Sequence, residues 1–403
     1  MVPSDPSNLE LKQAQVNFIP EGWKLDKVGD ALAIRNSFRK PISQEIRATI
    51  AGNYPYYGPT KIQDYISEYE QEGIYALIGE DGDHFLKYST MRQTQFISGK
   101  CTVNNHAHII ESTSQCDSEW FYNFFKHRNI TNFLSRQGAG RFKLNKATLQ
   151  KLPLLVPPLA EQRKIAKILS TWDKAISTTE RLIDNSQQQK KALMQQLLTG
   201  KKRFAGFKGE WEELNVKDFG KVVTGSTPPK SDDKNYGQEV SWATAEDFKN
   251  KYVANTNIKL SVAGATKARV VPKGSVLVTC IASIGKNAIA NEDLATNQQI
   301  NSVIISENHS NEFFYYLIEG NKHKLIAWAG TTAIPILNKS SFEKLKLFSP
   351  AKLEQQKVAS VLTNADKEIE HLKQQLADFK QEKKALMQQL LTGKRRVKIE
   401  KEF

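Results

Sequence analysis

The sequence predicts an α+β fold, with two mixed α/β domains separated by two long helices that pair as an antiparallel coiled coil, in a pseudo-two-fold internal repeat. The first observation is that the twelve residues KKALMQQLLTGK occur at Lys190–Lys201 and again at Lys383–Lys394. The second is that the same offset of 193 residues aligns Glu161-Gln162 with Glu354-Gln355 without a gap. A repeat of this length fixes the architecture, so we expect two half-molecules in one chain.

Composition limits the class of protein. At 403 residues the chain is too long for one ordinary core, so about two to four domains are expected. The net charge of +14 and the pI near 9.4 favour a polyanionic partner, nucleic acid before anionic membrane, although a chain can be basic without binding either. No apolar run approaches the roughly 20 residues of a membrane span. Cys101, Cys116 and Cys280 form no C-x-x-C pair, so we expect free thiols and a cytoplasmic location.

The two repeated segments are predicted to be helices over Leu159–Thr199 and Lys352–Thr392. Their apolar residues alternate at spacings of four and three, which is the seam of a paired helix. In the second copy the seam is Val358, Leu362, Ala365, Ile369, Leu372, Leu376, Phe379, Leu386 and Leu390. In the first copy it is Ile165, Leu169, Trp172, Ile176, Thr179, Ile183, Ser186, Leu193 and Leu197. The best-matched partner of each helix is the other copy, although each helix could instead pack only on its own domain.

Both predicted helices carry recognisable ends and one matched polar seam position. Pro157-Pro158 and Pro350 precede the starts, and Thr199-Gly200 and Thr392-Gly393 follow the last turns. The seam contains Lys190 in the first copy and Lys383 in the second. A lone polar residue in a seam tends to fix the register and orientation of the pair.

Two domains of short strands and a few helices are predicted between the repeats. Strands are expected at Tyr75–Ile78, Val276–Ile281 and Ile300–Ile305, and helices at Glu119–His127 and Asn311–His323. The two domains share little sequence except near their edges, where Leu144-Asn145-Lys146 matches Leu337-Asn338-Lys339 and where Trp23 and Trp211 open them. Matching edges with different sequences between them indicate that the two domains perform one task on two different targets. The predicted segments are residues 1–156, 157–203, 204–349 and 350–403.

The sequence holds no persuasive active site. Gly138–Lys143 fails the G-x-G-x-x-G pattern, and no G-x-x-x-x-G-K-[ST] occurs. Neither Pro-Pro pair stands in the N-P-P-aromatic context of amino-methylating enzymes. His106 and His108 could share one strand face, but no third metal ligand is evident, so a surface or core strand is the better interpretation.

The order of domain, long helix, domain and long helix resembles the specificity (S) subunit of a type I restriction–modification system. The most specific residues are Pro157–Ile165 (PPLAEQRKI) and the helix ends Leu197–Lys201 and Leu391–Lys394. Gly225–Pro229, Leu77–Gly82 and Thr296–Gln299 are also similar to segments common inside that family's target recognition domains. The resemblance covers essentially the whole chain, closely in the helices and in patches elsewhere.

This resemblance implies a function without catalysis in this chain. Each variable domain would read one half of an asymmetric, two-part site in double-stranded DNA. The paired helices would set the gap between the half-sites and dock two methyltransferase (M) subunits, which restriction (R) subunits could join. No cofactor or metal is expected in this chain, whereas S-adenosylmethionine, and ATP and Mg if a restriction subunit is present, would belong to the partners. Competing hypotheses are a coiled-coil assembly scaffold whose variable domains bind protein, and a self-contained nuclease or methylase.

DNA contacts are expected from loops of the variable domains. Phosphates are met by Lys and Arg, while base edges are read by Arg, Asn, Gln, Ser or Thr. The first-domain candidates are Tyr54, Tyr56, Tyr57, Lys61, Lys87, Arg92, Asn104, Asn105, Arg136, Gln137 and Arg141. The second-domain candidates are Ser226, Thr227, Lys230, Lys234, Tyr236, Ser283, Lys286, Asn297, Gln298, Thr331 and Thr332. For any single candidate, a solvated loop or a turn-stabilising side chain is an equally good interpretation.

Partner docking is expected on the helix starts, because two equivalent docking faces require the same residues in both copies. The candidates are Glu161, Gln162, Lys164, Glu354, Gln355 and Lys357. Acidic residues in a first turn also stabilise a helix start, so Glu161 has two possible roles. The basic runs Lys201-Lys202-Arg203 and Lys394-Arg395-Arg396 could touch phosphate or complement the helix dipole.

The expected role of the helices as a ruler can be tested by lengthening one of them. Inserting four residues between Asp184 and Lys190 adds about 6 Å of helix. The gap between half-sites should then widen by roughly one or two base pairs, at about 3.4 Å per base pair, with both half-sites unchanged. Mapping the methylated motif measures this, and an altered half-site with the gap preserved would contradict the ruler.

Overall fold

The computed structural model describes residues 11–12, 15–137, 141–330 and 335–399. The chain forms two compact units, one of residues 1–178 with 376–403 and the other of residues 179–375. The division falls inside both long helices, so each unit contains one domain, the start of one long helix and the end of the other. No helix in these residues is both long and apolar enough to span a membrane. The predicted domain limits remain predictions.

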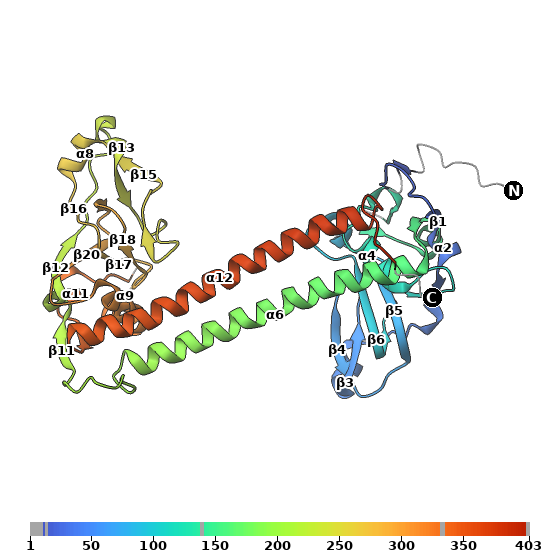
Figure 1. Ribbon diagram of the computed structural model, residues 1–403, viewed down its shortest axis with the longest axis horizontal. Helices are drawn as coiled ribbons and strands as arrows, with labels where there is room; N and C mark the ends of the chain where they lie inside the picture. The colour runs from blue at the N-terminus through green and yellow to red at the C-terminus, as the bar shows by residue number, and fades with distance from the viewer. Residues whose placement is uncertain (1–10, 13–14, 138–140, 331–334, 400–403) are drawn as a thin grey trace. The chain divides into compact units, whose positions relative to one another are not determined.

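The long helices are α6 (Leu159–Leu197) and α12 (Lys352–Leu390), drawn in green and red in Figure 1. Both lie within the predicted repeats. Gly200 and Gly393 follow them with φ of +69°, the left-handed conformation that closes a helix and favours glycine. After Gly200, the backbone N–H of Lys202 donates to the carbonyl of Gln196 in the last turn of α6, at 3.1 Å. The glycine stops predicted from the sequence are therefore confirmed.

Unit 1 contains a six-stranded sheet and two small antiparallel pairs; β3, β4, β5 and β6 of the large sheet are labelled in Figure 1. In spatial order the large sheet is β2 (Ala33–Ile34), β7 (Ala107–Glu111), β5 (Gln71–Gly79), β6 (Thr94–Val103), β3 (Ala51–Tyr57) and β4 (Ile62–Ile66). The pairs are β1 (Lys24–Lys27) with β10 (Pro153–Val156) and β8 (Ser135–Gln137) with β9 (Arg141–Lys143). Among the described strands of this sheet, β3 and β6 are the only parallel neighbours.

Unit 2 contains a five-stranded sheet, a four-stranded sheet and one small pair. The five-stranded sheet is β12 (Gly220–Thr224), β20 (Ile300–Ile305), β17 (Val276–Thr279), β18 (Asn287–Ala290) and β14 (Tyr252–Val253). The four-stranded sheet is β15 (Ile258–Leu260), β13 (Tyr236–Ala243), β19 (Leu294–Thr296) and β16 (Val270–Val271). The small pair is β11 (Glu212–Asn215) with β21 (Lys346–Ser349).

Short helices complete both domains in the same order. In unit 1 they are α2 (Val28–Ala31), α3 (Gln44–Thr49), α4 (Ser118–Phe125) and α5 (Lys146–Lys151). In unit 2 they are α7 (Val216–Phe219), α8 (Val262–Lys267), α9 (Asn311–Gly320), α10 (Lys322–Trp328) and α11 (Lys339–Glu343). The pairs α2/α7, α4/α9 and α5/α11 stand in corresponding places, which shows that the unlike domains share one frame. The predicted mixed α/β fold class is confirmed.

Each domain core is completed by both long helices. In unit 1 the buried side chains of Trp120 and Phe121 on α4 cluster with Ile165 from the start of α6 and Leu390 from the end of α12. In unit 2, Phe313 and neighbouring residues of α9 cluster with side chains from the end of α6 and the start of α12 in the same way. Burial of this apolar surface holds the helices on their domains.

The long helices run antiparallel in each unit. In unit 1 the rings of Trp172 on α6 and Phe379 on α12 lie 5.7 Å apart, edge to face. Asp173 on α6 pairs with Lys383 on α12 at 2.5 Å. Further towards the start of α6, Glu161 meets a residue beyond the end of α12. From Asp173 back to Glu161 on α6, the contacted residue therefore moves forward from Lys383 to Arg396. In unit 2, Lys190 on α6 pairs with Asp366 on α12, and Arg203 beyond α6 pairs with Glu354 nearer the start of α12, so the helices are antiparallel there too.

The two helix-closing glycines give a matched stability test. A Cβ at Gly393 would meet the Pro20 ring at 2.1 Å, whereas one at Gly200 would only touch the Trp211 ring at 3.4 Å. Both alanine variants force the left-handed conformation at a cost of about 1 kcal/mol. Gly393→Ala should therefore destabilise the protein clearly more than Gly200→Ala in urea unfolding, and equal losses would contradict the close contact.

Candidate nucleic-acid interface and its helical frame

The central strand of each domain ends in the same tight turn. β5 continues into Glu80-Asp81-Gly82, and β17 continues into Cys280-Ile281-Ala282. The last residue of each turn has positive φ, +130° at Gly82 and +62° at Ala282. Glycine adopts such angles freely, but alanine does so only where surrounding contacts impose them. At Ala282 one such contact is its N–H, which donates to the Pro335 carbonyl at 3.2 Å.

In each domain a second segment leads into a strand that neighbours the central one, β7 in unit 1 and β20 in unit 2. The Asn104 side-chain oxygen accepts the N–H of His106 at 2.8 Å, and that of Asn297 accepts the N–H of Gln299 at 3.1 Å. The carbonyls of His106 and Gln299 then each accept, at 2.8 Å, the N–H of the first residue of the tight turn. The asparagines thus shape the same backbone turn in both domains.

A third segment, which ends at Leu144 in unit 1 and at Leu337 in unit 2, bonds to the first residue of the tight turn. Leu144 donates its N–H to the Glu80 carbonyl at 2.7 Å, and Leu337 donates to the Cys280 carbonyl at 2.8 Å. These three segments form what we call the three-segment edge of each domain. It comprises residues 80–82, 104–106 and 141–144 in unit 1, and residues 280–282, 297–299 and 335–337 in unit 2.

The three-segment edge of unit 1 is lined by charged groups. The Arg39 guanidinium donates to the Glu80 carboxylate at 2.6 Å and to the Asn105 carbonyl at 2.9 Å. The Asp81 carboxylate lies 3.0 Å from Nδ1 of His106. The Asn105 side chain itself is exposed at the tip of its turn. The predicted contact residue Asn105 therefore lies beside charged groups that were not among the predicted DNA contacts.

The edge of unit 2 gathers four of the predicted DNA contacts. The Thr227 hydroxyl donates to the side-chain oxygen of Gln298, which is exposed in the turn that Asn297 shapes. The Ser226 carbonyl accepts the indole N–H of Trp242 at 3.0 Å. The Thr227 bond holds the loop at residues 225–229 against the three-segment edge, and the Trp242 bond attaches the same loop to β13. Polar side chains from two loops therefore present one surface.

The remaining second-domain candidates are less concentrated. The Tyr236 hydroxyl donates to the Pro228 carbonyl at 3.0 Å, and the Lys286 ammonium donates to the Ala245 carbonyl at 2.6 Å, so both side chains also support loops. Three candidates are exposed, namely Lys230, Lys234 and Ser283. Thr331 and Thr332 lie outside the described residues. One residue near this loop was not predicted: Arg269 is exposed, its backbone N–H donates to the Ser226 hydroxyl at 3.1 Å, and its guanidinium donates to the Thr224 carbonyl at 2.8 Å.

Burial corrects two first-domain predictions. Tyr56 is 1% exposed, and its hydroxyl accepts the N–H of Ile42 at 2.9 Å. Asn104 is 4% exposed, and its amide donates to Gln63 at 3.1 Å. Both side chains hold loops from inside, so the predicted direct DNA contact is wrong for these two residues. Asn297 uses its oxygen for the same turn as Asn104, although it is less deeply buried.

The other first-domain candidates are spread over several loops and strands. Tyr54 and Tyr57 are half-buried, while Lys61, Lys87, Arg92 and Arg136 are exposed. Gln137 and Arg141 lie on β8 and β9, and their side chains are outside the description. A basic and aromatic group was missed on β6, where the Lys100 ammonium lies 4.6 Å from the Tyr69 ring centre.

His106 and His108 bond to different partners. His106 bonds to Asp81, whereas His108 is buried between the Asn36 amide at 2.8 Å and the Leu144 carbonyl at 2.6 Å. Burial lowers the pKa of His108. Among the described residues, no cluster of three or more His, Cys, Asp or Glu side chains could hold an ion.

The glutamines at the helix starts are internal anchors. Gln162 is fully buried and accepts the N–H of Asp117, just before α4, at 2.8 Å. Gln355 is equally buried and accepts the N–H of Ser310, just before α9, at 2.8 Å. Each glutamine therefore attaches its long helix to the domain helix. This explains their repetition without a partner and corrects the prediction that Gln162 and Gln355 present docking groups.

The glutamates beside them are also committed internally. Glu354 is 2% exposed and is gripped through both oxygens by the Arg203 guanidinium, at 2.9 and 2.6 Å. Glu161 is similarly buried and accepts from Arg396 in the same two-pronged way, and from the Trp23 indole at 3.2 Å. These bonds tie the segment after one helix to the start of the other. Direct docking through Glu161 or Glu354 is therefore corrected as well.

Of the predicted docking residues, the two lysines remain available. Lys164 and Lys357 are exposed, at positions related by the repeat offset. The sequence does mark the two arginines as equivalent, since Arg203 and Arg396 obey the same offset of 193 residues. Those basic runs were predicted instead to touch phosphate or to complement the helix dipole.

A carboxylate on α6 joins three elements of unit 1. Asp173 pairs with the seam residue Lys383 at 2.5 Å and with Lys126, at the end of α4, at 3.5 Å. Lys126 is 2% exposed and also faces the Tyr122 ring at 4.7 Å. Burial lowers the pKa of both lysines, while the Asp173 pKa is lowered by the lysines against the opposing effect of its own burial.

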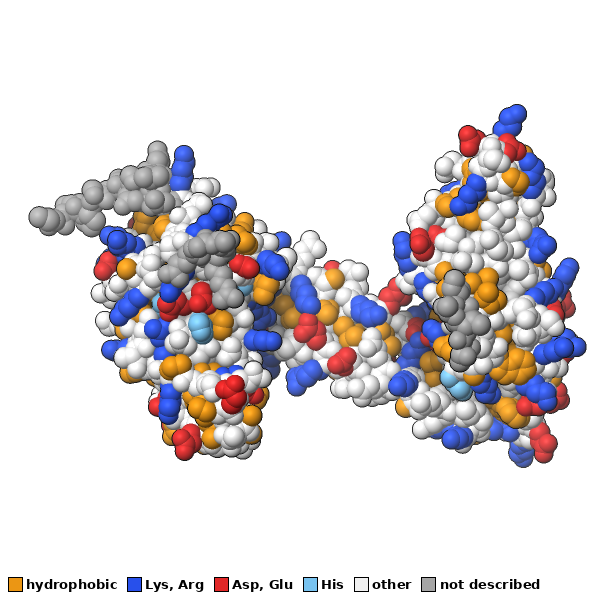
Figure 2. All heavy atoms as spheres, turned by 180° about the vertical axis from the view of Figure 1, so that it is seen from behind, with side chains coloured by type: hydrophobic (Ala, Val, Ile, Leu, Met, Phe, Trp, Pro, Cys, Tyr) orange, Lys and Arg blue, Asp and Glu red, His pale blue; other side chains and the backbone are white. Residues whose placement is uncertain are grey.

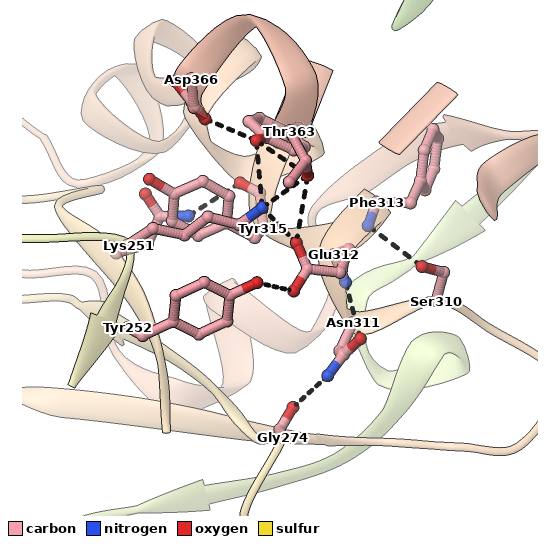
Figure 3. A network of polar contacts seen from close by, with 12 residues as sticks. Lys251, Tyr252, Gly274, Ser310, Asn311, Glu312, Phe313, Tyr315, Thr363 and Asp366 are labelled. Atoms are coloured by element: carbon pink, nitrogen blue, oxygen red, sulfur yellow. Dashed lines mark hydrogen bonds and ion pairs between the residues drawn. The ribbon is translucent and has the colours of Figure 1, made fainter. Parts of the chain in front are cut away.

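Asp366 on α12 is the matching carboxylate of unit 2, and Figure 3 shows its surroundings. It pairs with the seam residue Lys190 and accepts the Tyr316 hydroxyl of α9 at 2.5 Å. Tyr316 also accepts from Lys251 at 3.0 Å, and Lys251 forms an ion pair with Glu312. In each unit, one aspartate on a long helix therefore contacts both the other long helix and the domain. The domain residue that it contacts differs between the two units.

Comparison with known proteins identifies the family. A model described as the type I restriction modification DNA specificity domain matches residues 20–185 and again residues 208–380. The chain belongs to this family. The resemblance predicted from the repeats is confirmed, and the family's domain occurs twice, as the internal repeat requires.

Relatives in this family match over most of their length. A putative type I restriction enzyme specificity subunit of Haemophilus influenzae is 28% identical over 355 residues, which are 84% of this chain and 86% of that protein. The putative type I restriction enzyme MjaX specificity subunit of Methanocaldococcus jannaschii is 26% identical over 420 residues, covering 96% and 97%.

Solved structures of the family share the fold. The S subunit of a type I restriction–modification system from M. genitalium superposes with a TM-score of 0.63 at 11% identity, covering 95% of this chain and 98% of that chain. A chain from a study of complex assembly and conformational transition of the type I R-M system gives a TM-score of 0.56 at 15% identity, covering 93% and 99%.

Removing the shared carboxylate of unit 1 should be costly. Asp173→Ala leaves Lys126 and Lys383 buried without a counter-charge. We expect a loss of about 2 kcal/mol in urea unfolding, below the value for a fully buried pair, because the Asp173 side chain is 35% exposed. Replacing all three by apolar residues (Asp173→Leu, Lys383→Leu, Lys126→Met) should recover most of it.

The matched control is Asp184→Ala, which removes an exposed carboxylate from the same helix. It should change stability by less than about 0.5 kcal/mol. Equal effects of the two alanine substitutions would show that the three-way contact contributes nothing.

Proposed function

We propose that this chain is the DNA sequence-specificity subunit of a type I restriction–modification complex. Each domain would read one half of an asymmetric, two-part site in double-stranded DNA. The observation that carries this proposal is the double family match, once over each domain with part of a long helix. Two unlike domains on like helices are suited to two unlike half-sites, whereas a homodimer reads a palindrome.

The DNA surface is assigned to the loops around the three-segment edges. Exposed amides at the turn tips, Asn105 and Gln298, can donate to and accept from base edges in a groove. Lys and Arg side chains, which Figure 2 shows scattered over the drawn face of both units, would meet phosphates. The net charge of +14 supports this assignment, and it implies that binding weakens steeply as salt rises.

The helices serve as the frame of the complex. Their repeated starts would dock two methyltransferase subunits in equivalent ways, with exposed Lys164 and Lys357 as the matching contact residues. Restriction subunits would join through these partners. The chain would have no catalytic role of its own, so S-adenosylmethionine, and ATP and Mg where restriction occurs, would act in the partners.

The test is reconstitution with the modification subunit encoded nearby, followed by genome-wide mapping of methylated adenines. We expect a single two-part, asymmetric motif. Exchanging residues 18–156 for the equivalent domain of a relative should then change one half-site and leave the other and the gap unchanged. Methylation without sequence preference would contradict the proposal, as would a motif that is unaffected by the exchange.

A further inference from the structure

The two three-segment edges share one backbone bridge but not its side chains. The bridge joins Asp81 to Lys143 in unit 1 and Ile281 to Ile336 in unit 2. The surrounding hydrogen bonds of the turn agree within about 0.1 Å in both units. Two positions of one frame thus carry an acid and a base in one domain and two aliphatic groups in the other.

In unit 1 the bridge belongs to a network of charges. Lys143 lies 3.6 Å from the Glu80 carboxylate, which Arg39 also binds. Asp81 pairs with the exposed ring of His106. None of these side chains is fully buried, so charged donors and acceptors remain at the surface beside Asn105.

In unit 2 the same edge carries no charge at the matching positions. Cys280 replaces Glu80, and the two isoleucines replace the acid and the base. Ile336 is 52% exposed among polar loops. Exposure of an aliphatic side chain does not by itself stabilise the fold. The exposed amide of Gln298 belongs to the same edge.

The grooves of DNA distinguish these two chemistries. Guanine offers the acceptors O6 and N7 to Lys or Arg, and cytosine offers its N4 amino group to a carboxylate. Thymine offers a methyl group to aliphatic side chains, and adenine pairs with an amide such as that of Gln. A charged edge therefore suits G·C pairs, and an aliphatic edge with amides suits A·T pairs.

We propose that the bridge pair determines base choice in each half-site. Asp81 and Lys143 select a G·C pair in the half-site of the N-terminal domain. Ile281 and Ile336 select an A·T pair through the thymine methyl in the half-site of the C-terminal domain. This inference rests on the proposed function, and it adds the bases and the residues that read them.

The experiment transplants the pair between edges of the full chain, reconstituted with the modification subunit. Ile281→Asp with Ile336→Lys should shift one position of the C-terminal half-site from A·T towards G·C by on the order of tenfold in relative methylation. The other half-site and the gap should stay unchanged. The control Val262→Lys, at an exposed apolar position on α8, should leave the motif as it is.

A second measurement needs no variant. Duplexes that carry the mapped motif, with thymine replaced by deoxyuridine one position at a time, lose only the methyl group. We expect one such replacement in the C-terminal half-site to weaken binding of the wild-type complex several-fold, and Ile336→Ala to abolish that difference. Indifference to every deoxyuridine in the C-terminal half-site, or a transplant that moves no position, would each overturn the inference. Methylation without any motif would instead refute the proposed function.

Discussion

Completion of each domain core by two different helices is the constraint on which the rest of the structure depends. In unit 1, Trp120 belongs to the same buried cluster as Ile165 from the start of α6 and Leu390 from the end of α12. Neither half of the sequence supplies this core alone, although the halves are repeats of each other. Burial of these apolar groups fixes where each helix begins and ends relative to its domain, and the polar contacts then add direction.

Those polar contacts divide into a repeated set and an individual set. The repeated set consists of Gln162 with Gln355, the arginine–glutamate clamps, and the seam pairs of Asp173 and Asp366. The individual set lies where the domains meet the frame, as Lys126 in one unit and Tyr316 in the other. A common frame can therefore carry domains that differ in chemistry, provided that each finds its own partner for the shared aspartate.

Much of the frame could be predicted from the sequence, because the repeat and the helix-closing glycines are local signals. The helix ends at Gly200 and Gly393 follow directly from that pattern. The repeat offset marks Arg396 and Arg203 as matched residues, but no local pattern shows that Arg396 meets Glu161, which lies 235 residues away along the chain. Acidic first-turn residues are usually exposed, so nothing local marks this one as a clamp.

The candidate site was predicted in its parts but not in its arrangement. Asn104 and Asn297 were recognised as polar residues near turns, yet both shape the backbone, while the next residue in each turn is exposed. The repeat offset continues through these turns, so comparing the two copies there would have separated the shaping residue from its neighbour. Which side chain faces inward depends on partners such as Gln63, and those are set by the tertiary fold.

The division of the chain into one continuous and one discontinuous unit has a consequence for biosynthesis. Unit 2 consists of residues 179–375, whereas unit 1 also needs residues 376–403. At roughly 5–20 residues per second, the N-terminal domain waits about 10 to 40 s of synthesis for the helix end that covers its core. Its apolar surface around Trp120 is incomplete during that time. The domain made first is therefore the one finished last, and it is the part of the nascent chain that most needs protection from aggregation.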